Sequence, residues 1–200
     1  MKKSLLLSLR KHLVRVPRPI WQAEVDHSAK NAHHRLGFMS EDHHRVRDFV
    51  VLELPRLGTP IPAQVISDQL NLDLPRTEAI LAELEKGMTF LYRNPKGDVV
   101  WAYPVTVEPT PHRIRFSTGE QIYAACAIDA IATPFVQGQL RKEHLTCQVD
   151  TVCAHCNQSI AIEIDSDLHY KISTAGANPL VFAPMVDFDR LEDPSIIDAF

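Results

Sequence analysis

The sequence predicts an α+β protein in which three helices and a β-hairpin precede an antiparallel sheet. Between residues 40 and 87, apolar side chains recur with helical spacing, and proline and glycine interrupt them. From residue 89 onward, short stretches alternate apolar and polar side chains, as half-buried strands do. With 200 residues, 45% of them hydrophobic, the chain suits one ordinary domain or two small ones.

The overall charge and hydropathy narrow the class of protein. A net charge of −4 argues against the basic surface that nucleic-acid-binding proteins usually carry. No apolar stretch reaches the roughly 18 residues that a membrane span requires. The first apolar stretch is short and is broken by Arg10 and Lys11, so we do not expect a signal peptide. We expect a cytoplasmic location, where the four cysteines stay reduced.

Residues 1–39 are interpreted as a basic, irregular leader. Arginine and lysine recur in it, and Pro17 and Pro19 interrupt any regular element. Three histidines of the leader, His27, His33 and His34, lack a fixed ligand spacing, which argues against a metal site.

Residues 40–105 are predicted to form a winged-helix-like domain. Ser40 starts a first helix, which Pro55 and Gly58 are expected to end. Two further helices are expected at 62–70 and 75–87, and two strands, at 89–93 and 99–105, are joined by the turn sequence Asn94-Pro-Lys-Gly-Asp98.

Winged helices commonly bind DNA through their third helix. Here the polar positions of that helix combine three carboxylates with two cations: Glu78, Glu83, Glu85, Arg76 and Lys86. Such a balance repels phosphate groups, so we expect a packing module and regard nucleic acid as an improbable partner.

The run from Ile122 to Pro134 is predicted to be an apolar helix. Upstream, Ser117 with Glu120, and Thr118 with Gln121, have capping-box spacing. Pro134 marks the expected end of the helix, and 135–138 is expected to be a turn.

Within that run, Cys126 and Asp129 are three residues apart, which would place them on one helix face. A nucleophile beside a proton carrier is a pair suited to catalysis. The spacing by itself favours a structural role, however, because cysteine often serves as a small buried hydrophobe.

A second cysteine pattern, Cys153-Ala-His-Cys156, lies between strands expected at 145–152 and 159–164. Cys-x-x-Cys at a hairpin tip is half of a typical zinc site. The remaining ligands would have to come from scattered residues: Cys147, His144, His155 and His169. Cys153 and Cys156 are therefore tentative metal ligands, and a structural zinc ion is the less favoured interpretation.

The sequence of 122–134 resembles the active-site segment of the organomercurial lyases (alkylmercury lyases), in which Cys-Ala-Leu-Asp precedes an apolar stretch that reaches a proline. That family also carries a winged-helix-like region before its catalytic cysteine, so the resemblance covers about residues 40–200. It implies a catalytic domain of the alkylmercury lyase type, with an antiparallel sheet, at 106–200.

The resemblance implies protonolytic cleavage of carbon–mercury bonds, giving Hg(II) and a hydrocarbon, in mercury detoxification. Cys126 and Asp129 would be the catalytic residues and the mercury ligands, with sulfur capturing mercury and the carboxylate carrying the proton. No organic cofactor is implied. The partners would be a small organomercurial and cellular thiols, which remove the Hg(II) product. Cys153 would be mainly structural.

In one respect the chain departs from the family pattern. There, a short helix ending in an aromatic residue leads into a second essential cysteine, whereas the sequence here reaches Phe200 without one. Either the chain is a fragment truncated at its carboxyl end, or another cysteine replaces the missing one. Two alternatives stay open: a lyase-like metal-binding protein without catalysis, and a winged-helix metal-responsive regulator.

Overall fold

The computed structural model describes residues 6–9, 12–15, 19, 37–87, 91–153 and 157–176. The chain divides into two compact units, residues 1–38 with Phe200, and Met39–Ala199. In the first unit, β1 (Leu6–Leu9) pairs antiparallel with β2 (His12–Arg15), a hairpin that the sequence did not predict. Five candidate metal ligands fall outside the described residues: His27, His33, His34, His155 and Cys156.

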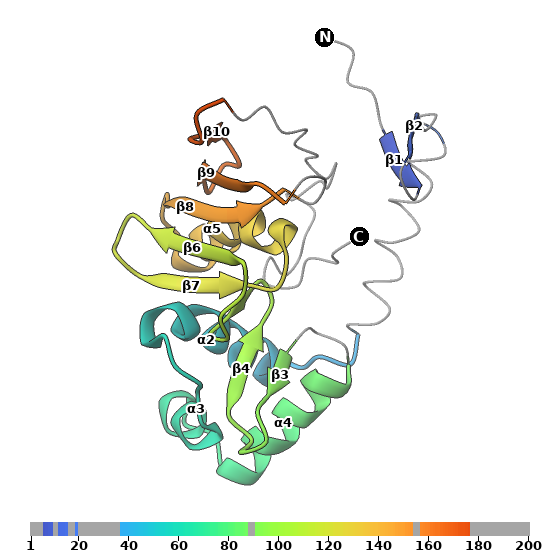
Figure 1. Ribbon diagram of the computed structural model, residues 1–200. Helices are drawn as coiled ribbons and strands as arrows, with labels where there is room; N and C mark the ends of the chain where they lie inside the picture. The colour runs from blue at the N-terminus through green and yellow to red at the C-terminus, as the bar shows by residue number, and fades with distance from the viewer. Residues whose placement is uncertain are drawn as a thin grey trace. The chain divides into compact units, whose positions relative to one another are not determined.

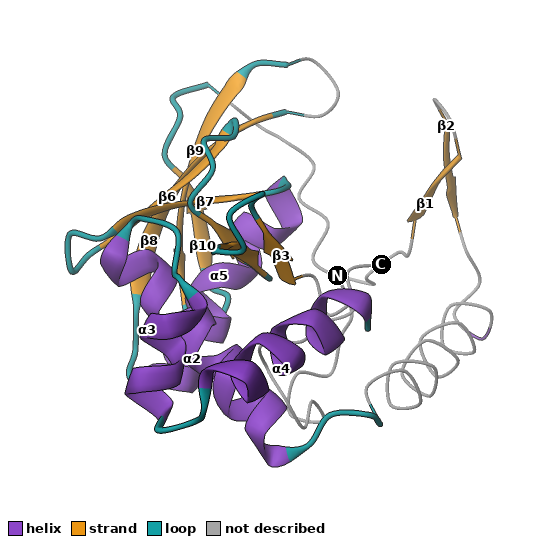
Figure 2. Cartoon of the chain, turned by 90° about the horizontal axis from the view of Figure 1, so that it is seen from below, coloured by secondary structure: helices purple, strands orange, loops and turns teal. Residues whose placement is uncertain are grey.

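The three predicted helices are present in the second unit: α2 (Glu41–Leu57), α3 (Ala63–Leu70) and α4 (Leu74–Lys86). Ser40 starts α2 as predicted, and its backbone N–H donates to Nδ1 of His43 at 3.1 Å. Gly58 follows the helix in the left-handed conformation, with φ of 62°. In Figure 2 the three helices form one group.

The prediction that Pro55 ends α2 is wrong, because Pro55 lies inside the last turn. Proline lacks an N–H, so the carbonyl of Val51, four residues earlier, loses its helical donor. The side-chain amide of Gln137 replaces it, since its Nε2 donates to the oxygen of Val51 at 2.8 Å. A contact from a distant part of the chain therefore compensates for the proline.

All strands of the second unit that the structure describes belong to one antiparallel sheet, in the order β10-β9-β8-β6-β7-β5-β4-β3 (Figure 1). The strands are β3 (Leu91–Arg93), β4 (Val99–Ala102), β5 (Val105–Thr106), β6 (His112–Phe116), β7 (Gln121–Ala124), β8 (Thr146–Val152), β9 (Ser159–Asp165) and β10 (Tyr170–Ile172). The α+β class and the antiparallel sheet are confirmed.

The hairpin β3–β4 follows the three helices, in the predicted order. It is continuous with the larger sheet, because β4 pairs with β5 and β5 pairs with β7. The short strand β5 spans residues 105 and 106, where the sequence interpretation divided the chain into two domains.

One face of the sheet is covered by α5 (Ala127–Arg141), which packs against β6, β7, β8 and β9 and lies behind them in Figure 1. Burial alternates along β8 and β9, as expected for strands with one covered face. The apolar side chains facing the helix include Val149, Ile160, Ile162 and Ile164.

The helix predicted from 122 to 134 is wrong in its position. Residues 112–116 and 121–124 are strands, and the helix starts after Cys126, passes through Pro134 and ends at Arg141. The expected capping residues lie instead in a tight β-turn, where Gly119 has φ of 99° and donates its N–H to the oxygen of Phe116 at 3.0 Å. The turn expected at 135–138 is also wrong, because these residues belong to the same helix.

The helices within the described segments are each too short or too polar to cross a lipid bilayer.

Candidate functional site

Cys126 lies at the junction between β7 and α5. The last residue of β7, Ala124, is opposite His112 in the sheet, and its carbonyl oxygen accepts a hydrogen bond from Oγ1 of Thr110 at 2.6 Å. Cys126 then adopts an extended conformation, with φ of −143°, and is the N-cap of the helix. The sheet thus fixes the strand end from which the thiol projects.

Cys126 and Asp129 are in contact as N-cap and third helical residue. The backbone N–H of Asp129 points at Sγ of Cys126 across 3.5 Å, which is the capping role usually taken by a serine or aspartate oxygen. The side chains also contact each other. The two predicted catalytic residues are therefore neighbours, although the helix that joins them begins later than predicted.

Opposing effects act on the thiol. Burial raises the pKa of Cys126, the backbone N–H of Asp129 lowers it, and the negative charge of the Asp129 carboxylate raises it again. Together these effects raise the pKa of Cys126. The partial positive charge of a helix N-terminus generally favours a thiolate, but it does not outweigh burial here.

The carboxyl group is similarly held toward its protonated form. Asp129 is only 5% exposed, and burial raises its pKa, while the hydrogen bond with the Cys126 thiol lowers it in part. Burial thus disfavours the charged form of both groups, and a raised pKa makes the Asp129 carboxylate a better proton acceptor for the neighbouring thiol.

Two buried polar residues border this pair from other elements. Tyr103, at the turn between β4 and β5, is 2% exposed, and its pKa is raised by burial and then by the nearby charges of Asp129 and Cys126. Arg47 on α2 is fully buried and donates from Nη2 to the backbone oxygen of Tyr103 at 3.2 Å. Its positive charge partly offsets the rise in the Tyr103 pKa.

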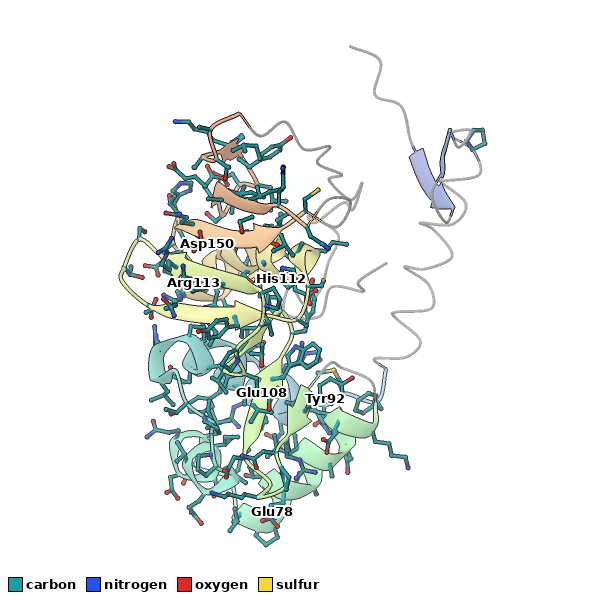
Figure 3. All side chains as sticks on the ribbon, in the orientation of Figure 1. Glu78, Tyr92, Glu108, His112, Arg113 and Asp150 are labelled. Atoms are coloured by element: carbon teal, nitrogen blue, oxygen red, sulfur yellow. The ribbon has the colours of Figure 1, made fainter. Side chains whose placement is uncertain are left out.

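His112, labelled in Figure 3, is the first residue of β6. It lies opposite Ala124, so it is at the same end of the sheet as Cys126. Its Nδ1 is 2.6 Å from Oγ1 of Thr151 on β8, and burial lowers its pKa. Cys153 follows two residues after Thr151, so the alternation of β8 places it on the face that α5 covers.

Cys153 is half-buried and packs against the core, and its backbone N–H donates to the oxygen of Gln158 at 2.8 Å. By strand spacing, β8 and β7 are two strands apart, roughly 10 Å between backbones. Cys153 therefore borders the Cys126 site without belonging to the contact pair. Cys156, its tentative partner, lies outside the described residues.

Cys147 is unsuited to act as a nucleophile or a mercury ligand, because it is 1% exposed and burial raises its pKa to about 12.

No sequence pattern predicts that Arg47, Tyr103 or His112 lies near Cys126. Each comes from a different element and reaches the site only through pairing or packing between distant segments. A buried arginine inside an amphipathic helix was the one local signal available, since Arg47 falls at an apolar position between Val46 and Val50.

The chain matches known proteins by family model, by sequence and by structure. Residues 105–187 match the family model described as alkylmercury lyase. An alkylmercury lyase of Staphylococcus epidermidis (strain ATCC 12228 / FDA PCI 1200) is 24% identical over 134 residues, which is 67% of this chain and 56% of that protein. The chain thus matches little more than half the length of this relative.

Among solved structures, the crystal structure of the mercury-bound form of MerB2 is similar, with a TM-score of 0.59 and 14% identity. The match covers 72% of this chain and 66% of the other. At this identity the likeness shows a shared fold.

Proposed function

We propose that this chain is an alkylmercury lyase that cleaves carbon–mercury bonds by protonolysis, because residues 105–187 match the family model of that description. The observation that carries the proposal is the contact between Cys126, as helix N-cap, and Asp129, as a buried carboxyl. Mercury(II) is soft and prefers sulfur, and a buried acid beside that sulfur can supply the proton.

In the proposed first step, the sulfur of Cys126 bonds to the mercury of an organomercurial cation, R–Hg⁺. The thiol proton passes to the carboxylate of Asp129, so that no other base is needed. The raised pKa of Asp129 favours its holding this proton in the buried site.

In the second step, Asp129 gives the proton to the carbon atom of the R–Hg bond. The electron pair of that bond goes to the new C–H bond, and the hydrocarbon R–H leaves. Mercury(II) stays on the sulfur of Cys126, with the carboxylate of Asp129 as a further ligand, until cellular thiols remove it. The scheme needs no organic cofactor, and we place it in the cytoplasm, where thiols are reduced.

A second sulfur on mercury would increase the electron density on carbon and ease its protonation. None of residues 157–200 is a cysteine. We propose that Cys153 or an added thiol serves as this second sulfur, since Cys153 lies at the same end of the sheet. An alternative function is a lyase-like protein that binds mercury compounds at Cys126 without cleaving them.

The test is hydrocarbon release from a simple organomercurial in excess thiol, measured by gas chromatography. We expect release with the wild type and none with Cys126→Ala, while Gln139→Ala, an exposed change on the same helix, acts like the wild type. Capture of the mercurial without release by the wild type would favour the binding protein. Undiminished release with Cys126→Ala would overturn both functions.

A further inference from the structure

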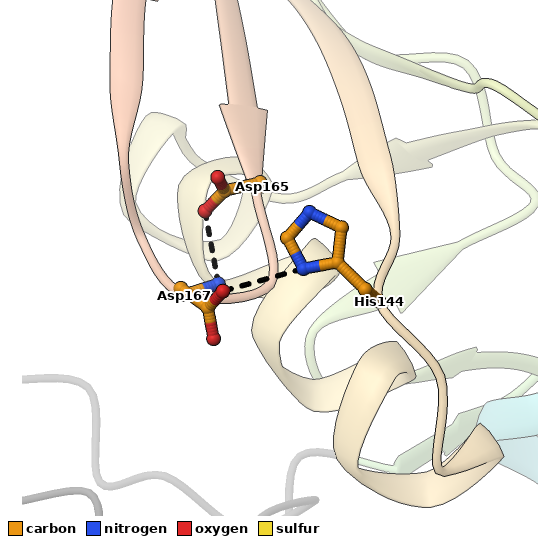
Figure 4. A group of neighbouring side chains, drawn as sticks. All are labelled: His144, Asp165 and Asp167. Carbon is orange, nitrogen blue, oxygen red and sulfur yellow. Dashed lines mark hydrogen bonds and ion pairs between the residues drawn. The ribbon is translucent and has the colours of Figure 1, made fainter.

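A second group of metal-ligating side chains lies beyond the end of α5 that is remote from Cys126. His144 belongs to the loop between α5 and β8, while Asp165 and Asp167 lie where β9 turns toward β10 (Figure 4). One ligand atom from each of the three lies within 4.8 Å of the others. The fold thus brings an imidazole and two carboxylates together from separate segments.

We propose that His144, Asp165 and Asp167 bind a divalent transition-metal ion of the zinc class, at a site separate from Cys126. Imidazole nitrogen and carboxylate oxygen both bind zinc at about 2.0–2.2 Å. Ligand atoms on opposite sides of one ion can therefore be roughly 4 Å apart, so small side-chain movements suffice. The inference does not depend on the proposed mercury chemistry.

The turn after β9 fixes the orientation of the Asp165 carboxylate. Its Oδ1 accepts the backbone N–H groups of Asp167 and His169, each at 2.9 Å. Its Oδ2 faces Nδ1 of His169 at 3.3 Å, so His169 is a neighbouring imidazole that can approach as a fourth ligand. An ion would thus find a carboxylate whose orientation the turn has already set.

The second carboxylate pairs with an imidazole as well, because Oδ2 of Asp167 is 3.3 Å from Nδ1 of His144 (Figure 4). The carboxylates therefore face groups that are themselves metal ligands. A metal ion entering between them exchanges two weak, solvent-exposed contacts for coordination bonds.

Two further features favour a cation at this place. The carboxyl end of α5, at Arg141, is one turn away, and the partial negative charge of a helix C-terminus attracts cations. The side chains of His144 and Asp167 are 58% and 66% exposed, so an ion reaches them from solvent. Once bound, it would join the α5–β8 loop to the β9–β10 turn and stabilise the folded state.

The test is calorimetric titration of the full chain with zinc chloride, using the wild type, His144→Ala and Asp167→Asn. Asp68→Asn, an exposed carboxylate change on α3, is the matched control. We expect both site variants to lose one zinc equivalent or to bind it at least about tenfold more weakly. The control should bind like the wild type. Equal stoichiometry and affinity in all four proteins would overturn the proposal.

Cobalt substitution separates this site from the cysteines, since thiolate ligation gives intense charge-transfer absorption and nitrogen and oxygen ligation does not. The cobalt signal lost in His144→Ala should be the weak ligand-field type. If the lost signal is thiolate absorption, the assignment is wrong. Melting curves without metal report the folding of each variant, and zinc should raise the melting temperature of the wild type and of Asp68→Asn alone.

Discussion

The backbone N–H of Asp129 donates to the sulfur of Cys126, so the reactive thiol is itself the cap of the helix that carries its acid partner. Replacing either residue therefore has a structural effect as well as a chemical one. The predictions below separate these effects with matched variants.

Asp129→Asn should still capture the mercurial, with the thiol proton passing to solvent, and should slow hydrocarbon release by about 10²–10⁴-fold, the usual contribution of a positioned proton donor. Asparagine keeps the side-chain size and cannot carry the proton. Single-turnover experiments would measure capture by mass spectrometry and release by gas chromatography. Equal release rates in wild type and variant would exclude Asp129 as the proton carrier.

The same variant should lower the pKa of the Cys126 thiol. Burial, the largest cause of the raised pKa, remains, but the negative charge of Asp129 and its hydrogen bond to the thiol both raise it further and are removed. Below the pKa of the wild-type thiol, alkylation by iodoacetamide should then be faster in the variant. Cys147 provides an internal control and should stay unmodified in both proteins, because it is buried. A slower reaction in the variant would contradict the charge interaction.

Gly138→Ala should destabilise the fold by about 1–3 kcal/mol, as overpacking generally does. A Cβ atom at Gly138 would lie 2.6 Å from Cβ of Ser166 and 3.0 Å from the backbone oxygen of Glu143. Urea unfolding measures the change. The neighbouring exposed change Gln139→Ala should stay within about 0.5 kcal/mol of the wild type. A neutral Gly138→Ala would mean that α5 does not approach the β9–β10 turn so closely.

Glu120→Gln should reduce stability at pH 7 by about 1 kcal/mol, with the difference disappearing in acid. Burial alone would raise the pKa of Glu120, but hydrogen bonds from Arg141 and Thr118 and the charge of Arg141 outweigh it, and the pKa is lowered. A carboxyl with a lowered folded-state pKa stabilises the protein above its unfolded-state pKa, and the effect is lost as pH falls through the folded value.

Urea midpoints of wild type and Glu120→Gln at several pH values would measure that difference. The exposed Glu78→Gln on α4 is the control and should show no such pH dependence. A difference that grows toward low pH would contradict the ion pair between Arg141 and Glu120, whose atoms are 2.9 Å apart.

Local signals predicted the helices α2, α3 and α4 to within one or two residues, because caps and apolar spacing lie within each segment. The region from 112 to 141 could not be predicted this way. Strand β6 is stabilised by pairing with β8, more than thirty residues away along the chain. An alanine-rich run such as 124–132 satisfies helical spacing at many starting points.

For the candidate site, the pair Cys126 and Asp129 was identified from its spacing together with the resemblance of 122–134 to the organomercurial lyases, and the contact between the two residues follows in either helix register. The positions of Arg47 and Tyr103 could be found only from the tertiary structure, because α2 and the β4–β5 turn come near α5 only in the folded protein. Side chains that come from several elements have no regular spacing along the sequence, so no sequence motif reveals them.

The sheet is connected through few backbone pairs at strand β5. This strand contributes two residues, pairing through Val105 and Thr106 with β4 but through Thr106 alone with β7. Ladders this short open more readily than the seven-residue pairing of β8 with β9. Amide hydrogen exchange should therefore divide the sheet into two cooperative blocks, with the strand that precedes Cys126 on the boundary between a slow and a faster-exchanging region.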